Sequence, residues 1–264
     1  PRTTRGPGQG AAALRALHQP GAPLVLPNIW DAAGACAVAA AGFPAVATSS
    51  AAVAEALGYA DGEATPVGEM LDAIARIARA TSVPVTADLE RGYGMRPAEL
   101  AERLAATGAV GCNLEDSDPA TSAMVDTGRQ ADFLAAARTA TREIDADLVI
   151  NARIDTYLHG AGDPGERLAA TIERARAYLA AGADCVYPIL ATTPEAIRAL
   201  VDQTGGPVNV LFHAGAPSIA ELVALGVARI SLGPGLHRAA QAHLTGMLTR
   251  IAGGDSPYTT PQPS

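Results

Sequence analysis

One local pattern recurs along the chain: an alanine-rich helical stretch ends in glycine, and a short apolar strand follows within a few residues. The pattern appears around Gly42, Gly108, Gly182 and Gly226. Glycine readily ends a helix in the left-handed conformation, and a short apolar, β-branched run is typical of a buried strand. Helices that alternate with buried strands favour parallel pairing and right-handed crossovers. This repeat constrains the fold more than any other feature of the sequence.

Eight such strands are predicted in the 264 residues, centred on Val25, Val46, Val85, Val110, Ile150, Val186, Val210 and Ile230. Helices are predicted at 11–18, 32–41, 66–80, 97–107, 129–143, 164–181, 194–204, 217–225 and 234–251. Eight units in this length predict a single TIM (β/α)8 barrel domain over 1–264, with an extra C-terminal helix. A doubly wound open sheet is the alternative, although no GxGxxG follows the first strand. Flexible tails are expected at 1–10 and 253–264.

Charge and composition exclude several classes of protein. The net charge is −8 and no basic cluster exists, so neither nucleic acid nor an anionic membrane is expected as a partner. No run of 18 apolar residues and no signal peptide is found, which predicts a cytoplasmic protein. All 19 basic residues are arginine. Schiff-base, pyridoxal phosphate and Walker A chemistry are therefore excluded, because each needs a lysine amine.

The cysteines and histidines carry little signal. Cys36, Cys112 and Cys185 lie in apolar runs without metal-ligand spacing, so buried free thiols are expected. His213 is the one histidine expected at a strand end, and a lone histidine is not assigned to catalysis. The other four are interpreted as surface residues: His18, His159, His237 and His243.

Acidic side chains gather where the predicted strands end. Asp88 and Glu90 close the strand around Val85, and Glu115 closes the next one. Residues i and i+2 of a strand point to the same side, so Asp88 and Glu90 are expected to face one point. Each acid alone would also fit an exposed turn. Together they predict a site for Mg²⁺ on the face where barrel enzymes place their chemistry, because converging carboxylates repel each other unless a cation or a shared proton lies between them.

Other polar residues are expected on the same face. Arg153 and Asp155 end the strand at Ile150, and Asn209 begins the polar end of the seventh strand. The segment Ser49-Ser50-Ala51 would bind a carboxylate or phosphonate, or else form a helix N-cap. Asp61 lies in a turn, where it would hold a metal-bound water or only shape the backbone.

These motifs resemble those of the isocitrate lyase/phosphoenolpyruvate mutase superfamily. The resemblance rests on Ala47-Thr48-Ser49-Ser50, Gly58-Tyr59-Ala60-Asp61, Asp88-Leu89-Glu90-Arg91-Gly92-Tyr93-Gly94, Leu114-Glu115-Asp116 and Asn151-Ala152-Arg153. It implies a TIM-like barrel that forms a homotetramer with the last helix exchanged between neighbouring subunits. It also implies Mg²⁺, with Mn²⁺ as a substitute, and a small oxo-acid or phosphonate substrate.

By position, the resemblance assigns roles to individual residues. Asp88 would ligate Mg²⁺ directly, while Asp61, Glu90 and Glu115 would hold metal-bound waters. Glu90 departs from the commoner aspartate. The substrate would contact Ser49, Ser50, Ala51 and Arg153, with Arg153 binding an acidic group. Asp88 and Asn209 are also expected to contact substrate, from their places at strand ends. The catalytic set is then Arg153, Asp61 and Glu115.

One segment departs from the superfamily pattern. Lyases carry Lys-Lys/Arg-Cys-Gly-His after Leu-Glu-Asp, whereas residues 117–126 here contain no cysteine, lysine or histidine. The lysine and asparagine of the mutase branch are missing too. Residues 117–127 are expected to form a mobile lid that excludes water but supplies no general acid near neutral pH.

Three functions remain open from the sequence. The first is a Mg²⁺-dependent C–C lyase or hydrolase of a small α-oxo or 2-hydroxy dicarboxylate, similar to oxaloacetate or methylisocitrate, that acts through a pyruvate enolate. The second is a P–C bond enzyme of the phosphonopyruvate hydrolase or phosphoenolpyruvate phosphonomutase type. The third is a weakly catalytic protein that binds oxo acids.

Overall fold

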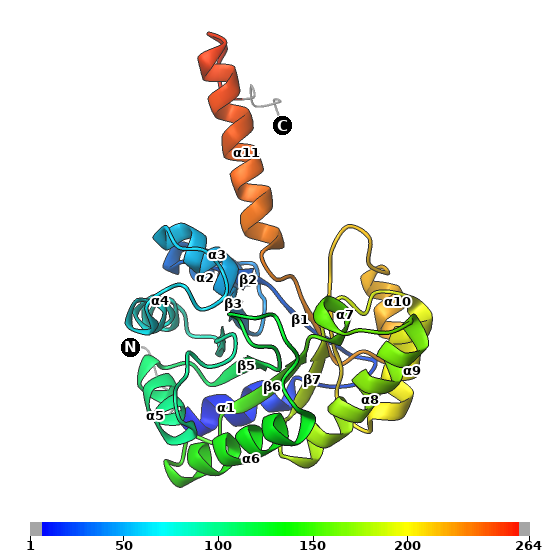
Figure 1. The fold of residues 1–264 in the computed structure, drawn as a ribbon. Helices are drawn as coiled ribbons and strands as arrows, with labels where there is room; N and C mark the ends of the chain where they lie inside the picture. The colour runs from blue at the N-terminus through cyan, green and yellow to red at the C-terminus, as the bar shows by residue number, and fades with distance from the viewer. Residues whose placement is uncertain (1–6, 259–264) are drawn as a thin grey trace.

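The computed structural model describes residues 7–258, and Figure 1 shows their fold. The strands are β1 (Leu24–Leu26), β2 (Asn28–Ile29), β3 (Val46–Thr48), β4 (Val85–Asp88), β5 (Gly111–Glu115), β6 (Val149–Ile154), β7 (Cys185–Pro188), β8 (Asn209–Leu211) and β9 (Arg229–Ser231). The helices are α1 (Pro7–Ala16), α2 (Ala32–Ala40), α3 (Ser50–Leu57), α4 (Val67–Ala80), α5 (Pro97–Thr107), α6 (Thr127–Glu143), α7 (Thr156–His159), α8 (Pro164–Ala180), α9 (Pro194–Thr204), α10 (Ile219–Ala224) and α11 (Gly235–Ala252).

The strands form a closed parallel barrel. One run pairs β2 through β7 in sequence order, and a second pairs β1 with β9 and β9 with β8. Because only Pro27 separates β1 from β2, the two form one interrupted barrel strand that belongs to both runs. A parallel bridge between Val186 and Val208 joins the runs on the other side. The predicted TIM-type barrel with an extra C-terminal helix is confirmed.

Amphipathic helices cover the outside of the barrel. In α4, buried residues recur at helical spacing, from Met70 and Ile74 to Ile77. Several helices end in a left-handed glycine, as at Gly58 and Gly108. The cap at Gly108 is one that the sequence repeat predicted. The helix–glycine–strand repeat in the sequence therefore indicates local helix caps and apolar helix faces that pack against the strands.

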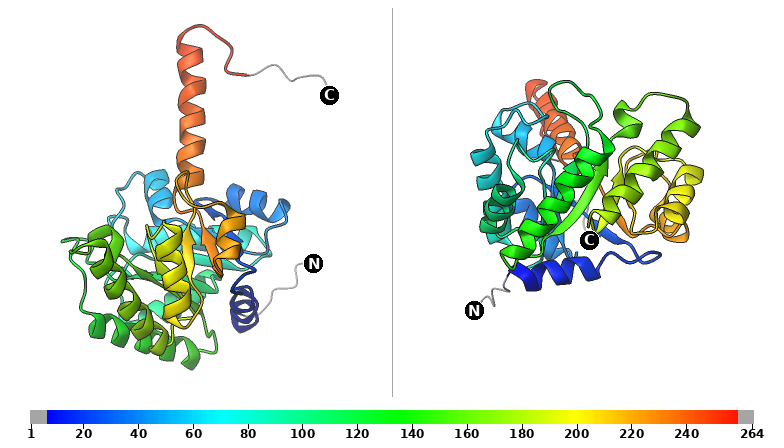
Figure 2. Two further views of the ribbon diagram at one scale, coloured as in Figure 1. Left: turned by 90° about the vertical axis from the view of Figure 1, so that its right-hand side faces the viewer. Right: turned by 60° about the horizontal axis from the view of Figure 1, so that its bottom comes forward.

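The two ends of the barrel are closed differently. At the N-terminal ends of the strands, α1 lies across the opening, while α11 projects away from the opposite end (Figures 1 and 2). Gly10 of α1 lies so close to Val110 that a Cβ atom there would meet the valine methyl at 2.7 Å. Ala11 and Leu14 complete a buried apolar cluster with residues of β1 and β3.

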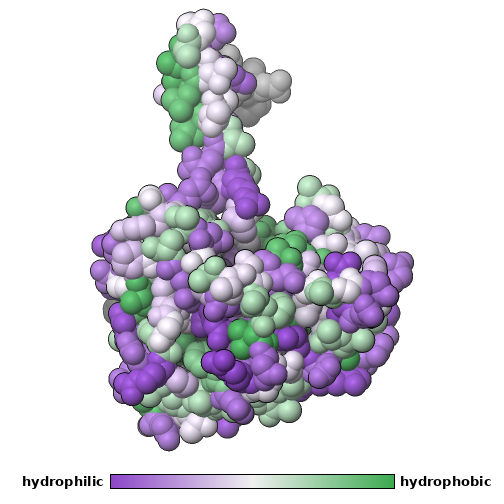
Figure 3. Space-filling view, viewed as in Figure 1, coloured by the Kyte–Doolittle hydropathy of each residue, from purple (hydrophilic) through white to green (hydrophobic). Residues whose placement is uncertain are grey.

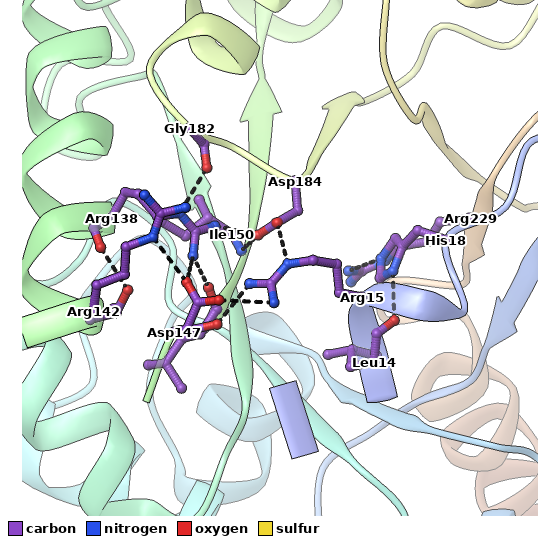
Figure 4. A network of polar contacts seen from close by, with 12 residues as sticks. Leu14, Arg15, His18, Arg138, Arg142, Asp147, Ile150, Gly182, Asp184 and Arg229 are labelled. Carbon is purple, nitrogen blue, oxygen red and sulfur yellow. Dashed lines mark hydrogen bonds and ion pairs between the residues drawn. The ribbon is translucent and has the colours of Figure 1, made fainter. Parts of the chain in front are cut away.

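Ion pairs hold α1 and α6 to this end of the barrel (Figure 4). Arg15 Nε lies 2.6 Å from Asp184 Oδ1, and its Nη1 lies 3.1 Å from Asp147 Oδ2. Arg138 of α6 pairs with the same two carboxylates. Two shared acids therefore bind α1 to the barrel wall and leave the opposite face free for chemistry.

Some boundaries and exposures differ from the predictions. Helix α1 begins at Pro7 rather than at 11, and the short helices α3 and α7 were not predicted as separate helices. His18 and His237 are buried, and Cys36 is exposed, each against expectation. The reason is packing from elsewhere in the chain: α1 places His18 in the barrel floor, and Trp30 packs edge-on against the ring of His237. The outer parts of the predicted tails, 1–6 and 259–264, lie outside the described residues.

No helix within residues 7–258 is both long enough and apolar enough to cross a membrane.

Candidate active site

Two adjoining pockets open at the C-terminal ends of the strands. The axial pocket, of about 230 Å³, is lined by residues from strands around the whole barrel, among them Asn28, Asp88, Asn113, Tyr187 and Ser231. The second pocket, of about 210 Å³, lies beside it against residues 117–122, which belong to a hairpin after β5, and is called the hairpin pocket. Both pockets are lined by Ser50, Asp61, Leu158 and Arg153. Most of the predicted site residues therefore meet at one composite cavity.

Asp88 is held at the N-terminus of α3. Its Oδ2 accepts hydrogen bonds from the backbone N of Ser50 at 3.1 Å and from its Oγ at 2.9 Å. Its Oδ1 accepts from Asn113 Nδ2 at 3.3 Å. Ser49 caps α3, while Ser49, Ser50 and Ala51 all line the axial pocket. The N-cap interpretation of this segment is confirmed, whereas its binding of a substrate carboxylate or phosphonate stays a prediction, which the helix end favours.

Strand alternation predicted that Glu90 and Asp88 face one point. This prediction is wrong, because the two side chains line different pockets. The strand ends at Asp88, and Glu90 adopts a left-handed φ of 49°, which turns it to the hairpin pocket. Tyr93 Oη donates to Glu90 Oε1 and the Glu63 backbone N donates to Oε2, both at 2.6 Å. Burial raises the pKa of Glu90 to about 7, although the Tyr93 hydrogen bond opposes that shift. Both Glu90 oxygens are therefore already engaged within the protein.

The loop after α3 and the loop after β4 restrain each other through residues in the left-handed conformation. Glu63 and Tyr93 have φ values of 60° and 54°. Glu63 Oε1 accepts from the backbone N of Tyr93 at 2.6 Å and of Arg91 at 3.1 Å. Non-glycine residues in this conformation cost free energy unless the surroundings fix them. The reciprocal contacts supply that restraint and place the acids.

Arg153 of β6 pairs with Glu115 at the end of β5 and with Asp155, which directly follows β6. Its Nη1 lies 2.7 Å from Glu115 Oε2, and its Nε lies 2.7 Å from Asp155 Oδ1. Although burial alone would lower the pKa of Arg153, the carboxylates of Glu115 and Asp155 raise it, so the guanidinium stays charged. Burial also raises the pKa of Glu115, and Arg153 opposes that shift. Asp155 is fully buried and accepts a hydrogen bond from Ser117.

The cavity has more acidic than basic side chains. Asp61, Asp88, Glu90 and Glu115 line it beside two arginines, Arg153 and Arg238, and Arg153 pairs with Glu115. Burial and the nearby Asp88 raise the pKa of Asp61. Oxygen donors with an uncompensated charge suit a hard divalent cation such as Mg²⁺.

The arrangement of these acids bears on how a metal would bind. Within residues 7–258, no group of three or more histidine, cysteine, aspartate or glutamate side chains is placed to ligate one ion. The expected set needs only Asp88 as a direct ligand, with Asp61, Glu90 and Glu115 acting through water. The residues therefore fit a largely hydrated Mg²⁺, which keeps several waters in protein sites.

Asn209 and Asp155 were expected on this face, but neither lines a pocket. Asp155 instead lies buried beside Arg153. Asn209 is fully buried in β8, and its Nδ2 donates to Ser231 Oγ at 3.2 Å. His213 also lies outside both pockets and accepts from the Gly215 backbone N at 3.0 Å.

Several lining residues were missed from the sequence. Asn113 precedes Glu115 by two positions, so strand alternation could have indicated it. Arg238 at the base of α11 and His159 on α7 carry no sequence signal, because their place depends on the course of the chain after the strand.

The predicted lid forms a compact hairpin. Asp118 N donates to Ala123 O at 2.9 Å, and Val125 N donates to Asp116 O at 2.8 Å. Asp118 Oδ1 also accepts from the backbone N of Ala120 and Thr121. Asp118, Pro119 and Ser122 form a wall of the hairpin pocket. That the segment moves on ligand binding stays a prediction.

A parallel barrel with an acidic cavity at its C-terminal strand ends is an enzyme architecture. The phosphoenolpyruvate phosphomutase family model matches residues 14–252, and the chain belongs to this family. A Burkholderia cenocepacia protein of solved structure, provisionally described as a phosphonomutase, is 45% identical, with a TM-score of 0.87 over 91% of this chain and 99% of its own. An uncharacterised protein of Mycobacterium tuberculosis is 37% identical over 86% of this chain and 85% of its own length.

A third similar protein is a 2,3-dimethylmalate lyase of the same superfamily, 29% identical, with a TM-score of 0.80 over 95% of this chain and 90% of its own. The predicted superfamily is thus confirmed, and the chain is an enzyme of the lyase and mutase type.

Proposed function

We propose that the protein is a Mg²⁺-dependent lyase or hydrolase that cleaves a C–C bond of a small α-oxo or 2-hydroxy dicarboxylate through a pyruvate-type enolate. The observation that carries this proposal is that Asp88 and Arg153 line the same axial pocket. Asp88 offers carboxylate oxygens for a cation, and Arg153 offers a guanidinium for an acidic group. A substrate with two acidic ends suits both.

Residues of this chain would divide the work as follows. Asp88 would ligate the metal, with Asp61, Glu90 and Glu115 around it. When bound, Mg²⁺ would supply a Lewis acid that neutralises negative charge as it develops on the substrate. Arg153 would orient the second acidic group, because a guanidinium binds a carboxylate at two points. The hairpin at 117–125 would exclude water from the reacting bond.

The size of the cavity supports a small substrate. The two adjoining volumes, of about 230 and 210 Å³, are each below the range of about 300–1,000 Å³ that is usual for ligand sites, and the walls are rich in polar groups. The 2,3-dimethylmalate lyase among the similar structures is named for a diacid of this class.

A P–C bond enzyme is the second candidate. Its support is the 45% identity to the Burkholderia protein described as a phosphonomutase. A phosphonate would bind between Arg153 and the N-terminus of α3, where a carboxylate is expected for the first candidate. A guanidinium and a helix N-terminus each bind phosphonates as well as carboxylates.

We also propose that the protein forms a homotetramer with α11 exchanged between subunits. Helix α11 projects from the barrel with a hydrophobic stripe along one side (Figure 3). Its exposed apolar residues include Leu244, Leu248 and Ile251, spaced to lie on one face. Light scattering should give a tetramer for the full chain and a smaller species for a chain that ends before α11. A monomeric full chain would contradict this proposal.

The reaction is tested by a substrate screen with Mg²⁺. Oxaloacetate, methylisocitrate, dimethylmalate and phosphonopyruvate are supplied in turn, while pyruvate, oxalate, phosphate and phosphoenolpyruvate are measured. Turnover of a diacid without formation of phosphate or phosphoenolpyruvate from phosphonopyruvate supports the first candidate, and the reverse supports the second. Binding without turnover of any compound would contradict both and leave an oxo-acid binding protein. Methylisocitrate cleavage at about 1 s⁻¹ or more would show that the missing loop cysteine has been replaced.

A further inference from the structure

The guanidinium of Arg229 is buried inside the barrel and forms no ion pair with a carboxylate of the described residues. It lies in β9 and is fully buried, and its Nε has no hydrogen-bond partner among the described residues. No acid of the described chain lies within ion-pair distance of it. Its Nη1 lies 3.5 Å from His18 Nε2 (Figure 4), and its Nη2 donates to Asn113 Oδ1 at 3.2 Å. Burial of a charge without a partner costs free energy, and an apolar side chain in its place is often neutral or stabilising.

The contact with Asn113 leads to the axial pocket. Asp88, Asn113 and Asn151 lie side by side on β4, β5 and β6, in parallel register. Asn113 Oδ1 accepts from Asn151 Nδ2 at 2.8 Å as well as from Arg229. Asn113 Nδ2 donates to Asp88 Oδ1 at 3.3 Å.

This pattern fixes which way the Asn113 amide points. Its oxygen meets two donors, one of them charged, so a flipped amide would bring its NH₂ against the donors of Arg229 and Asn151. With Arg229 present, the NH₂ must face Asp88. Without it, only Asn151 and the Asp88 carboxylate itself oppose the flip, and the Asn113 amide loses the charged donor that holds its oxygen.

We propose that Arg229 is a positioning residue that acts through Asn113 to hold the Asp88 carboxylate in its binding orientation. Ser50 restrains Oδ2 from one side and Asn113 restrains Oδ1 from the other. Partners behind a metal ligand orient it, and their loss typically lowers metal affinity by about 10- to 100-fold. This inference rests on the proposed role of Asp88 as the metal ligand.

The test measures Mn²⁺ affinity by electron paramagnetic resonance and thermal stability, without reliance on turnover. Arg229→Met should bind Mn²⁺ at least about tenfold more weakly while melting at the same or a higher temperature. Arg229→Lys should recover part of the affinity. If Arg229 acts through Asn113, the double variant Arg229→Met/Asn113→Ser should bind Mn²⁺ no more weakly than Asn113→Ser alone.

Arg138→Met is the matched control. Arg138 is also buried, but it pairs with Asp147 and Asp184 at the opposite end of the barrel (Figure 4) and lines neither pocket. It should melt at a lower temperature and keep the wild-type Mn²⁺ affinity.

The outcomes separate the two claims. A wild-type protein that does not bind Mn²⁺ would overturn the proposed function and the inference with it. A wild-type protein that binds, together with an Arg229→Met variant of equal affinity, would overturn the inference alone. An Arg229→Met variant that loses stability and affinity in parallel, with additive effects in the double variant, would show a structural role and also overturn it.

Discussion

Arg153→Lys tests whether the arginine between the two pockets grips substrate. The guanidinium makes three contacts with two buried carboxylates: 2.7 Å to Glu115, and 2.7 and 3.3 Å to Asp155. These contacts hold its plane, and the side chain still lines both pockets. A lysine ammonium keeps the charge but cannot make the same planar, two-point contact with a carboxylate.

The expected loss follows from the number of contacts. Hydrogen bonds to charged groups are each worth about 1.5–3 kcal/mol. A change that breaks the two-point grip on a buried acidic group should therefore cost about 2–4 kcal/mol in the transition state. At 1.36 kcal/mol per factor of ten, kcat/KM should fall by about 30- to 900-fold.

Arg174→Lys is the matched control. Arg174 is similarly buried and lies 2.9 Å from Asp116, but it lines neither pocket. Both variants are assayed for kcat/KM on the substrate found in the screen and for thermal stability. Arg174→Lys should lose stability without a comparable loss of kcat/KM. Near-normal kcat/KM for Arg153→Lys, or an equal loss in the two variants, would refute the assigned contact with substrate and leave Arg153 as an internal partner of Glu115 and Asp155.

Two further predictions concern acid stability and the hairpin. Burial and Arg229 lower the pKa of His18 from 6.5 to about 4. The unfolded chain therefore binds more protons between these values, so the stability lost from pH 7 to pH 5 should include about 2 kcal/mol from His18. Urea unfolding should show that His18→Gln removes this part of the pH dependence, and an unchanged dependence would contradict the burial argument. Oxo acid with Mg²⁺ should slow amide exchange in residues 117–127, whereas unchanged exchange there would show that the hairpin is not a lid.

The order of elements could be predicted because it depends on local signals. Apolar strand runs, glycine caps such as Gly108, and helical spacing each act within a few residues, and all of them indicated the same parallel barrel. The acids at the strand ends followed from topology, since parallel strands bring their C-terminal ends to one face.

The errors arose where distant contacts decide the outcome. His18 was taken as exposed because nothing nearby in the sequence shows that α1 closes the barrel floor. Glu90 was expected beside Asp88 because strand alternation was extended past the last strand residue. Arg229 alternates with an apolar neighbour, but only the closed barrel shows that its side of β9 faces inward and reaches Asn113.

In the proposed mechanism, Asp88 binds a divalent metal that turnover needs. Calorimetric titration with Mg²⁺ and the substrate assay are performed on the wild-type protein, Asp88→Ala and the exposed-acid control Asp72→Ala of α4. Asp88→Ala should lose both Mg²⁺ binding and turnover, because its two oxygens are held toward the axial pocket by Ser50 and Asn113. Asp72→Ala should retain both. An Asp88→Ala protein with unchanged Mg²⁺ affinity would contradict the metal assignment.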